Sequence, residues 1–274
     1  MHRFSAPDGT ELAFTDTGTG FPILCLSGLT RDRRDFEYVA PCLEGYRMIC
    51  LDYRGRGASN WAPYETYTIP VEAQDTVALL DHLGLAQAAI LGTSRGGLIA
   101  MLLAATAKDR LAGVCLNDIG PEIAADGLAD ISGYLGKVPP QKSFAEMAPV
   151  RAARLPGFEN VPMERWEAEV RKHFVETDAG LGLTYDPKLR DAVLESSAAP
   201  AADAWPLFDA LAGLPLALIR GANSNLLSLE TAQEMQRRRP DMIWRDVPDR
   251  GHVPFLDEPD AVAVLREWLE RLPA

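Results

Sequence analysis

The stretch Ala89–Ile99 reads AILGTSRGGLI and is the most informative part of this 274-residue chain. Its apolar start is typical of a buried strand, Gly92–Gly96 follows the pattern Gly-x-Ser-x-Gly, and the apolar residues from Leu98 onward suit a buried helix. Glycines two positions before and after a serine let a strand and a helix approach closely, so that the serine hydroxyl stands clear of both. The five-residue pattern alone more often marks a simple turn. The strand before it and the helix after it favour a nucleophile elbow, with Ser94 as the nucleophile.

Short apolar runs elsewhere in the chain predict further strands. They lack the alternation of half-buried strands, which is typical of strands buried on both faces. The expected strands comprise residues 23–26, 48–51, 88–91, 113–116, 214–219 and 242–247. Segments with helical periodicity separate them, most clearly Val71–Leu83, where Pro70 suits the first turn. This alternation predicts a parallel, doubly wound sheet, preceded by an antiparallel hairpin over Arg3–Asp16.

Residues 121–205 interrupt the alternation. The segment is rich in proline and contains amphipathic pieces such as Met163–Val175, but no apolar run typical of a strand. An irregular loop of this length is uncommon in a compact domain. We therefore expect a mostly helical lid over residues 121–205, inserted into a core formed by residues 1–120 and 206–274.

The composition fits a folded α/β domain, with 47% hydrophobic residues. A net charge of −12 argues against nucleic acids or anionic membrane surfaces as partners, because binding to these needs clustered Lys and Arg side chains. The first 19 residues are polar and no apolar run is long enough for a bilayer span, so that a soluble cytoplasmic protein is expected. The sequence contains no metal or nucleotide motif, and we expect neither a metal nor a cofactor.

The four cysteines have no Cys-x-x-Cys spacing, and three of them lie in strand-like apolar runs. They are Cys25, Cys42, Cys50 and Cys115. We expect reduced, mostly buried side chains. A catalytic cysteine is the alternative, but none of the four lies in a glycine elbow.

A serine nucleophile needs a base within hydrogen-bonding distance, and the chain has four histidines. His2 lies at the N-terminus. His82 and His173 lie in expected amphipathic helices, where a solvated imidazole is the usual case. His252 follows the last expected strand, in a loop that can carry its imidazole to the elbow. We expect His252 to be the general base.

Three further motifs accompany the elbow at Ser94. They are Leu26–Leu29 (LSGL), Asp52–Ser59 (DYRGRGAS) and Gly251–His252 near the end of the chain. With these four motifs the chain resembles the α/β-hydrolase fold family over nearly its whole length. The resemblance implies an eight-stranded, mostly parallel sheet with helices on both faces and a helical cap between strands six and seven.

The resemblance also implies an oxyanion hole made of two backbone amides. Leu29 stands at the family's position for one donor, in a loop where this chain has Ser27 instead of the usual histidine. Arg95, directly after the nucleophile and at a helix N-terminus, supplies the second amide. The Arg95 side chain either binds a substrate carboxylate or, as is more common, pairs with a neighbouring surface acid.

The third catalytic residue has two candidates. The resemblance places an acid a few residues after the seventh strand, where this chain has Asn225. An asparagine can accept a hydrogen bond from the imidazole, but it brings no full charge to stabilise the imidazolium. Asp118, at the end of the sixth strand, is the alternative, because some family members place their acid there. A third interpretation is that Asn225 replaced an acid and made the enzyme less active.

These residues predict a serine hydrolase acting on a small-molecule substrate, either a carboxylic ester or a lactone. Ser94 would form an acyl-enzyme, with His252 as the base. Acyltransferase, C–C hydrolase and perhydrolase activities use the same site and remain open. A ligand receptor with little or no turnover is the alternative from another functional class, and Asn225 is its support. A serine elbow argues against haloalkane dehalogenase and epoxide hydrolase, since relatives with those activities have aspartate there.

Overall fold

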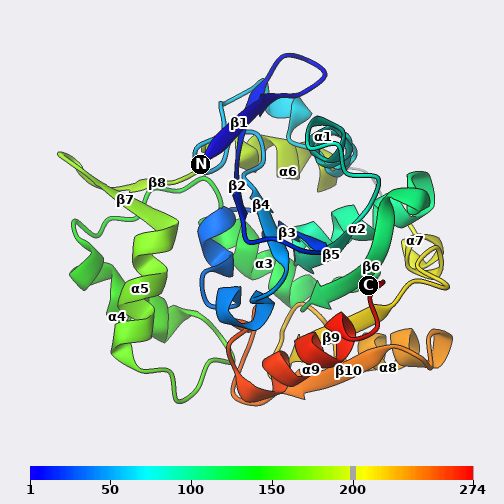
Figure 1. Ribbon diagram of the computed structural model, residues 1–274. Helices are drawn as coiled ribbons and strands as arrows, with labels where there is room; N and C mark the ends of the chain where they lie inside the picture. The colour runs from blue at the N-terminus through cyan, green and yellow to red at the C-terminus, as the bar shows by residue number, and fades with distance from the viewer. Residues whose placement is uncertain (198–201, 274) are drawn as a thin grey trace.

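A computed structural model describes residues 1–197 and 202–273 (Figure 1). Its main sheet has eight strands in the order β1-β2-β4-β3-β5-β6-β9-β10. The strands are β1 (His2–Ser5), β2 (Glu11–Thr17), β3 (Pro22–Leu26), β4 (Arg47–Leu51), β5 (Ala88–Thr93), β6 (Leu111–Asn117), β9 (Leu216–Gly221) and β10 (Ile243–Val247). The first strand pairs antiparallel with β2 and β2 antiparallel with β4, whereas the other pairs are parallel. The prediction of an eight-stranded, mostly parallel sheet is confirmed.

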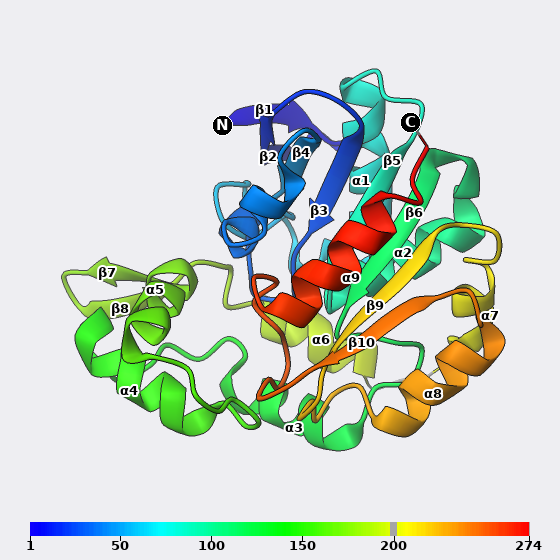
Figure 2. The same ribbon diagram turned by 60° about the horizontal axis from the view of Figure 1, so that its bottom comes forward.

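Helices cover both faces of this sheet, as Figure 2 shows for α9 on the near face and α1 and α2 behind it. The core helices are α1 (Ile69–His82), α2 (Arg95–Thr106), α7 (Trp205–Asp209), α8 (Leu229–Arg238) and α9 (Pro259–Leu269). Two separate hydrophobic clusters result, one on each face. Every residue of β5 is therefore buried, which explains why its sequence is apolar without alternation. None of the described helices is long and apolar enough to cross a bilayer.

The chain between β6 and α7 forms a separate group of elements beyond the carboxyl ends of the central strands (Figure 2). It comprises α3 (Ala125–Tyr134), α4 (Phe144–Arg154), α5 (Met163–His173), β7 (Phe174–Thr177), β8 (Gly180–Leu183) and α6 (Leu189–Ser197). We call this group the cap. Residues 198–201 of the expected lid lie outside the described residues.

The expectation of a cap without strands is wrong, because β7 and β8 pair as an antiparallel hairpin. The sequence pattern merges β7 with the preceding helix, whereas the structure ends that helix at His173. The turn of the hairpin relies on Gly180, whose φ of 123° is unsuited to other residues, and on a hydrogen bond from the Thr177 hydroxyl to the Gly180 carbonyl. Turn chemistry of this kind leaves no periodic signal in the sequence.

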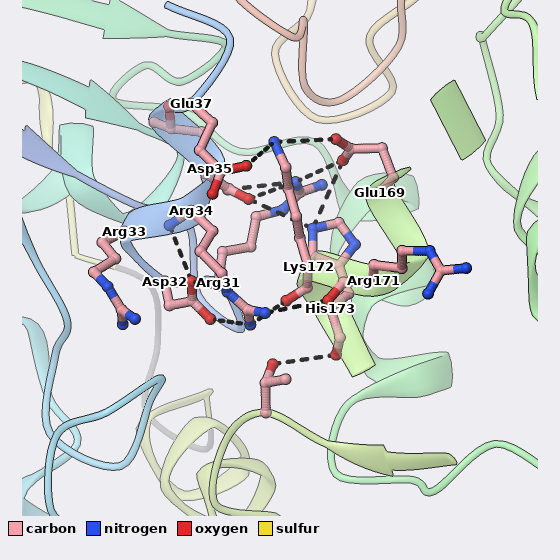
Figure 3. A network of polar contacts seen from close by, with 12 residues as sticks. Arg31, Asp32, Arg33, Arg34, Asp35, Glu37, Glu169, Arg171, Lys172 and His173 are labelled. Atoms are coloured by element: carbon pink, nitrogen blue, oxygen red, sulfur yellow. Dashed lines mark hydrogen bonds and ion pairs between the residues drawn. The ribbon is translucent and has the colours of Figure 1, made fainter. Parts of the chain in front are cut away.

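A polar network joins the cap to the core (Figure 3). The core side of the network is the loop after β3, which includes the short 3-10 helix η1 (Arg33–Phe36). Arg34 donates hydrogen bonds to the backbone carbonyls of Arg171 and Lys172 at the end of α5. Arg31 forms an ion pair with Glu169, one turn earlier in the same helix. The loop after β3 therefore fixes the position of α5.

The four cysteines are free, and Cys25, Cys50 and Cys115 are buried while Cys42 is half-buried, as expected. Burial raises the pKa of the Cys115 thiol, and it raises that of Cys25 as well. A buried thiol with a raised pKa is a poor nucleophile, so these two residues serve the packing of the sheet.

Candidate active site

Ser94 occupies a sharp turn between β5 and α2, with φ 50° and ψ −113°. Its backbone N–H donates to the carbonyl of Asn117 at 3.0 Å, and the N–H of Gly96 donates to the carbonyl of Ser27 at 3.1 Å. A Cβ atom on Gly96 would lie 2.0 Å from the carbonyl oxygen of Leu26, so that only glycine fits at this position. A positive φ at a non-glycine residue is a strained conformation that the surrounding structure must enforce. The turn thus has the geometry that the glycine spacing predicts.

His252 lies next to Ser94, and the two side chains are joined by a short polar contact. The distance between His252 Nε2 and Ser94 Oγ is 3.0 Å, and that between His252 Nδ1 and Asp118 Oδ2 is 2.7 Å. The Asp118 side chain is fully buried, and the imidazole is 16% exposed. Ser94, His252 and Asp118 therefore form one continuous line of hydrogen bonds, in the arrangement that lets a base take a proton from the serine hydroxyl.

Asp118 directly follows β6 and is held there by backbone and side-chain contacts. Its φ is 55°, and its N–H donates to the carbonyl of Ile219 at 2.7 Å. Besides His252, two groups of the loop after β9 donate to its carboxylate: the backbone N–H of Gly221 at 2.8 Å and the hydroxyl of Ser224 at 2.7 Å. These donors satisfy a carboxylate that has lost its contact with water, and they fix its orientation toward the imidazole.

Asn225 does not contact His252, and the expectation that its amide orients the imidazole is wrong. Its side-chain N–H donates instead to the carboxylate of Asp130 on α3 at 2.6 Å, at the exposed edge of the loop. The reason is the course of the loop after β9. Gly221 and Ser224 face Asp118, and the buried Leu226 follows at once, so that Asn225 points outward between them.

Two backbone amides near Ser94 have no acceptor among the described residues. They are those of Leu29, in the loop after β3, and of Arg95, the first residue of α2. The carbonyl of Leu29 accepts from the Arg56 guanidinium at 3.1 Å, which fixes its loop. The Ser27 carbonyl accepts from the Tyr53 hydroxyl. Free N–H groups at a helix N-terminus and in a fixed loop can stabilise negative charge on a substrate oxygen.

The Arg95 guanidinium is occupied by the protein itself. It pairs with Glu72 of α1 at 2.5 Å and donates to the carbonyl of Tyr67 at 2.9 Å. Glu72 is fully buried and also pairs with Arg56 at 2.9 Å. Of the two expectations for Arg95, pairing with an acid describes the structure, although the acid is buried and not at the surface.

Two adjoining cavities lie between the core and the cap. The inner one, of about 40 Å³, is lined by Ser94 and His252, and the outer one, of about 240 Å³, lies among the cap elements. Thr30, Tyr134 and Arg151 line both, so that they mark the connection between the nucleophile and the larger space. Among the described residues no cluster of His, Cys, Asp and Glu side chains is arranged to hold a metal ion.

His173 is buried in the cap, and the expectation of a solvated imidazole is wrong. Burial lowers the pKa of this imidazole well below its ordinary value of 6.5, and the positive charges of Arg31 and Arg151 add to the effect. The imidazole of His173 is therefore neutral near pH 7. The helical pattern of the sequence suggested that His173 lies on an exposed helix surface. In the structure the C-terminal end of α5 packs against the loop after β3, which covers this side chain.

Two residues of the site carry no signal that the sequence alone reveals. Ser224 stands beside Asn225 in the loop after β9, yet only the fold shows that its hydroxyl reaches Asp118. Arg151 reaches the cavities from α4, whose residues were expected only as part of a helical lid.

Comparisons with known proteins agree with this fold. Residues 22–259 match the family model of the alpha/beta hydrolase fold. The chain is 38% identical over 257 residues to a 3-hydroxybutyrate-oligomer hydrolase of Cupriavidus necator, covering 90% of this chain and 87% of that protein. An alpha/beta hydrolase from Novosphingobium aromaticivorans superposes with a TM-score of 0.92 at 37% identity, over 99% of this chain and 98% of that one.

A malate-bound esterase from Thermogutta terrifontis is similar as well, with a TM-score of 0.74, 26% identity and 99% of both chains covered. These relatives are hydrolases, and the match extends over almost the whole chain. The protein is a hydrolase and belongs to the alpha/beta hydrolase fold family.

Proposed function

We propose that the protein is a serine esterase that hydrolyses small carboxylic esters through an acyl-enzyme on Ser94. The observation that carries the proposal is the line from Ser94 Oγ to His252 Nε2 at 3.0 Å and from His252 Nδ1 to Asp118 Oδ2 at 2.7 Å. The 3-hydroxybutyrate-oligomer hydrolase among the relatives makes short oligoesters of hydroxy acids the first substrates to test.

In the proposed mechanism His252 removes the proton from Ser94 as the hydroxyl attacks the ester carbonyl. Asp118 keeps the imidazole in the productive tautomer and stabilises its protonated form. The amides of Leu29 and Arg95 stabilise the oxyanion of the tetrahedral intermediate. The protonated imidazole then donates its proton to the leaving alcohol, and water, activated by the same imidazole, releases the acid and restores Ser94.

The contacts of Asn225 weaken the alternative of a ligand receptor with little turnover. That alternative depended on an amide in place of the acid, whereas a buried carboxylate lies 2.7 Å from the imidazole and Asn225 pairs with Asp130. The lid over residues 121–205 belongs to the proposal as the part of the protein that encloses the substrate.

Hydrolysis of a p-nitrophenyl ester series and of the 3-hydroxybutyrate dimer tests the proposed function. We expect the wild-type protein to cleave short-chain esters fastest, because the cavities are small. Ser94→Ala should reduce activity on the order of 10⁶-fold, as loss of the nucleophile does in subtilisin. A Ser94→Ala variant with wild-type activity, or a folded wild-type protein that cleaves none of these esters, would contradict the proposal.

A further inference from the structure

The two cavities over Ser94 carry positive charge in a protein whose net charge is −12. The residues that line them include four cationic side chains and, among the described residues, no Asp or Glu. The cations are Arg31, Lys137, Arg151 and Arg154. A small concave region of opposite sign to the rest of the molecule concentrates anionic small molecules at the catalytic serine.

The charge of Arg31 is neutralised within the protein. Its guanidinium forms ion pairs with Asp35 at 3.2 Å and Glu169 at 3.5 Å, as Figure 3 shows. Burial works against this charge, but the two carboxylates outweigh that effect and raise the pKa of Arg31 above its ordinary value. Arg31 therefore serves the contact between core and cap.

Arg151 has no such partner. No ion pair or side-chain hydrogen bond joins its guanidinium to the described residues, and its Nε atom is buried without an acceptor. Burial lowers the pKa of Arg151, and the neighbouring charge of Arg31 lowers it further. The Arg151 side chain is half-buried, and for a partly buried cation without a partner a ligand of opposite charge is the natural complement. Because Arg151 lines both cavities, such a ligand would extend from the guanidinium to Ser94.

We propose that Arg151 binds a carboxylate carried by the substrate, so that the enzyme selects esters of hydroxy acids with a free acid group. This inference rests on the proposed esterase function. A guanidinium presents a planar set of donors that matches a carboxylate with two parallel hydrogen bonds. The outer cavity, about 240 Å³, is smaller than the pockets of roughly 300 to 1,000 Å³ that hold drug-sized ligands, which favours a short substrate. An oligoester of a hydroxy acid combines an ester bond with a terminal carboxylate.

A matched pair of substrates tests the inference: the 3-hydroxybutyrate dimer with its free carboxylate, and the same dimer with a primary amide in place of that carboxylate. The two differ in charge and hardly in size, and each has one ester bond. We expect wild-type kcat/KM to be about 10- to 100-fold higher for the acid, since a hydrogen bond to a charged group contributes that much. Equal kcat/KM values for the acid and the amide in the wild-type protein would overturn the inference without using any variant.

Substitutions of Arg151 test whether this residue causes the preference for the acid. Arg151→Met should remove the preference for the acid, chiefly by raising the KM for the acid. Arg151→Lys should retain part of the preference. Arg171→Met serves as the matched control, because Arg171 is an exposed arginine of the cap that lines neither cavity, and we expect its acid-to-amide ratio to be unchanged. A wild-type ratio in the Arg151→Met protein would assign the preference to another group and overturn the inference.

A binding measurement adds a readout that does not depend on turnover. Free 3-hydroxybutyrate should inhibit the wild-type enzyme competitively and raise its Tm, and Arg151→Met should weaken both effects by about 10-fold or more. If the wild type cleaves the acid and the amide equally, only the carboxylate site fails. If it cleaves neither, the esterase function itself fails.

Discussion

Asp118 reaches His252 from the end of β6, while Asn225, at the position that the family resemblance suggests for the acid, faces Asp130. The sequence could not decide between the two, because both follow central strands at the same edge of the sheet. The backbone of two loops decides which side chain contacts His252. Asp118 adopts a positive φ, and the Ser224 hydroxyl points toward the Asp118 carboxylate. The contact between Ser94 and His252 was predictable, since the turn at Ser94 follows from local glycine spacing and the choice of His252 from the small number of histidines.

The assignment of the acid leads to a paired prediction. Asp118→Asn should reduce kcat by about 10⁴-fold, as the same change does in serine proteases, because the amide favours the wrong imidazole tautomer. Asn225→Ala should change kcat less than 10-fold, since the side chain lies outside the line of hydrogen bonds. Steady-state kinetics with a p-nitrophenyl ester measures both. If kcat decreased more in Asn225→Ala than in Asp118→Asn, Asn225 and not Asp118 would be the third catalytic residue.

His173 leads to a prediction about stability and pH. The pKa of this imidazole lies well below 6.5 in the folded protein because of burial and the charges of Arg31 and Arg151, which outweigh the nearby carboxylates of Asp35 and Glu169. The unfolded chain binds a proton as the pH falls below about 6.5, whereas the folded chain does not. Protonation then favours unfolding, and folded stability decreases by up to about 1.4 kcal/mol per pH unit from this group.

Urea denaturation between pH 8 and pH 5 measures this effect. His173→Met should be less sensitive to acid than the wild type over the range below pH 6.5, and the two curves should be parallel above it. An identical decline in both proteins would mean that other groups cause the acid sensitivity.

At the level of elements, the connection between β5 and α2 requires close backbone contacts, both between the two elements and between α2 and the end of β3. A Cβ on Gly92 would lie 2.7 Å from the backbone of Gly96, and one on Gly96 would lie 2.0 Å from the Leu26 carbonyl. The apolar run and the two glycines made this connection predictable from the sequence. The hairpin of β7 and β8 was not predictable, because each strand has only four residues, β7 is mostly exposed, and the two leucines of β8 alternate with Gly180 and Gly182.

Gly96→Ala should displace the elbow from the loop after β3. The added methyl group collides with fixed backbone, so we expect stability to decrease by about 1–3 kcal/mol and ester hydrolysis to decrease at least as strongly as for loss of one oxyanion donor, about 10²-fold. Gly133→Ala is the control, since a Cβ there meets nothing within 4 Å in helix α3. Thermal unfolding and ester hydrolysis measure the two effects. If Gly96→Ala were as stable and active as Gly133→Ala, the close approach at the elbow would not be needed.

At the scale of the whole molecule, the core supplies Ser94, His252 and Asp118, the three proposed catalytic residues, and the cap supplies most of the outer cavity. Composition and proline content indicated that the alternation of strands and helices is interrupted between β6 and β9. The cavity itself was not predictable, because its lining comes from loops and helices whose packing depends on contacts far apart in the sequence. Arg34 is one such contact, joining the loop after β3 to the end of α5 (Figure 3).

Arg34→Met should loosen the cap without unfolding the core. The substitution removes hydrogen bonds to two carbonyls at the end of α5, so that amide hydrogen exchange should become faster in α4 and α5 and stay unchanged in β5 and β6. Arg237→Met is the control, because within residues 1–197 and 202–273 that arginine pairs with Glu234 alone, on the surface of α8. Faster exchange in the central strands to the same extent as in the cap would show that the two parts do not open separately.

Covalent labelling tests the central claim most directly, that His252 activates Ser94 with the help of Asp118. The protein is treated with a fluorophosphonate, and intact mass and peptide mapping then identify the modified residue. We predict one phosphonyl group on Ser94 of the wild type, no labelling of Ser94→Ala, and labelling of Asp118→Asn that is slower by orders of magnitude than that of Asn225→Ala. A wild-type protein that takes up no label, or takes it up at another residue, would contradict the account.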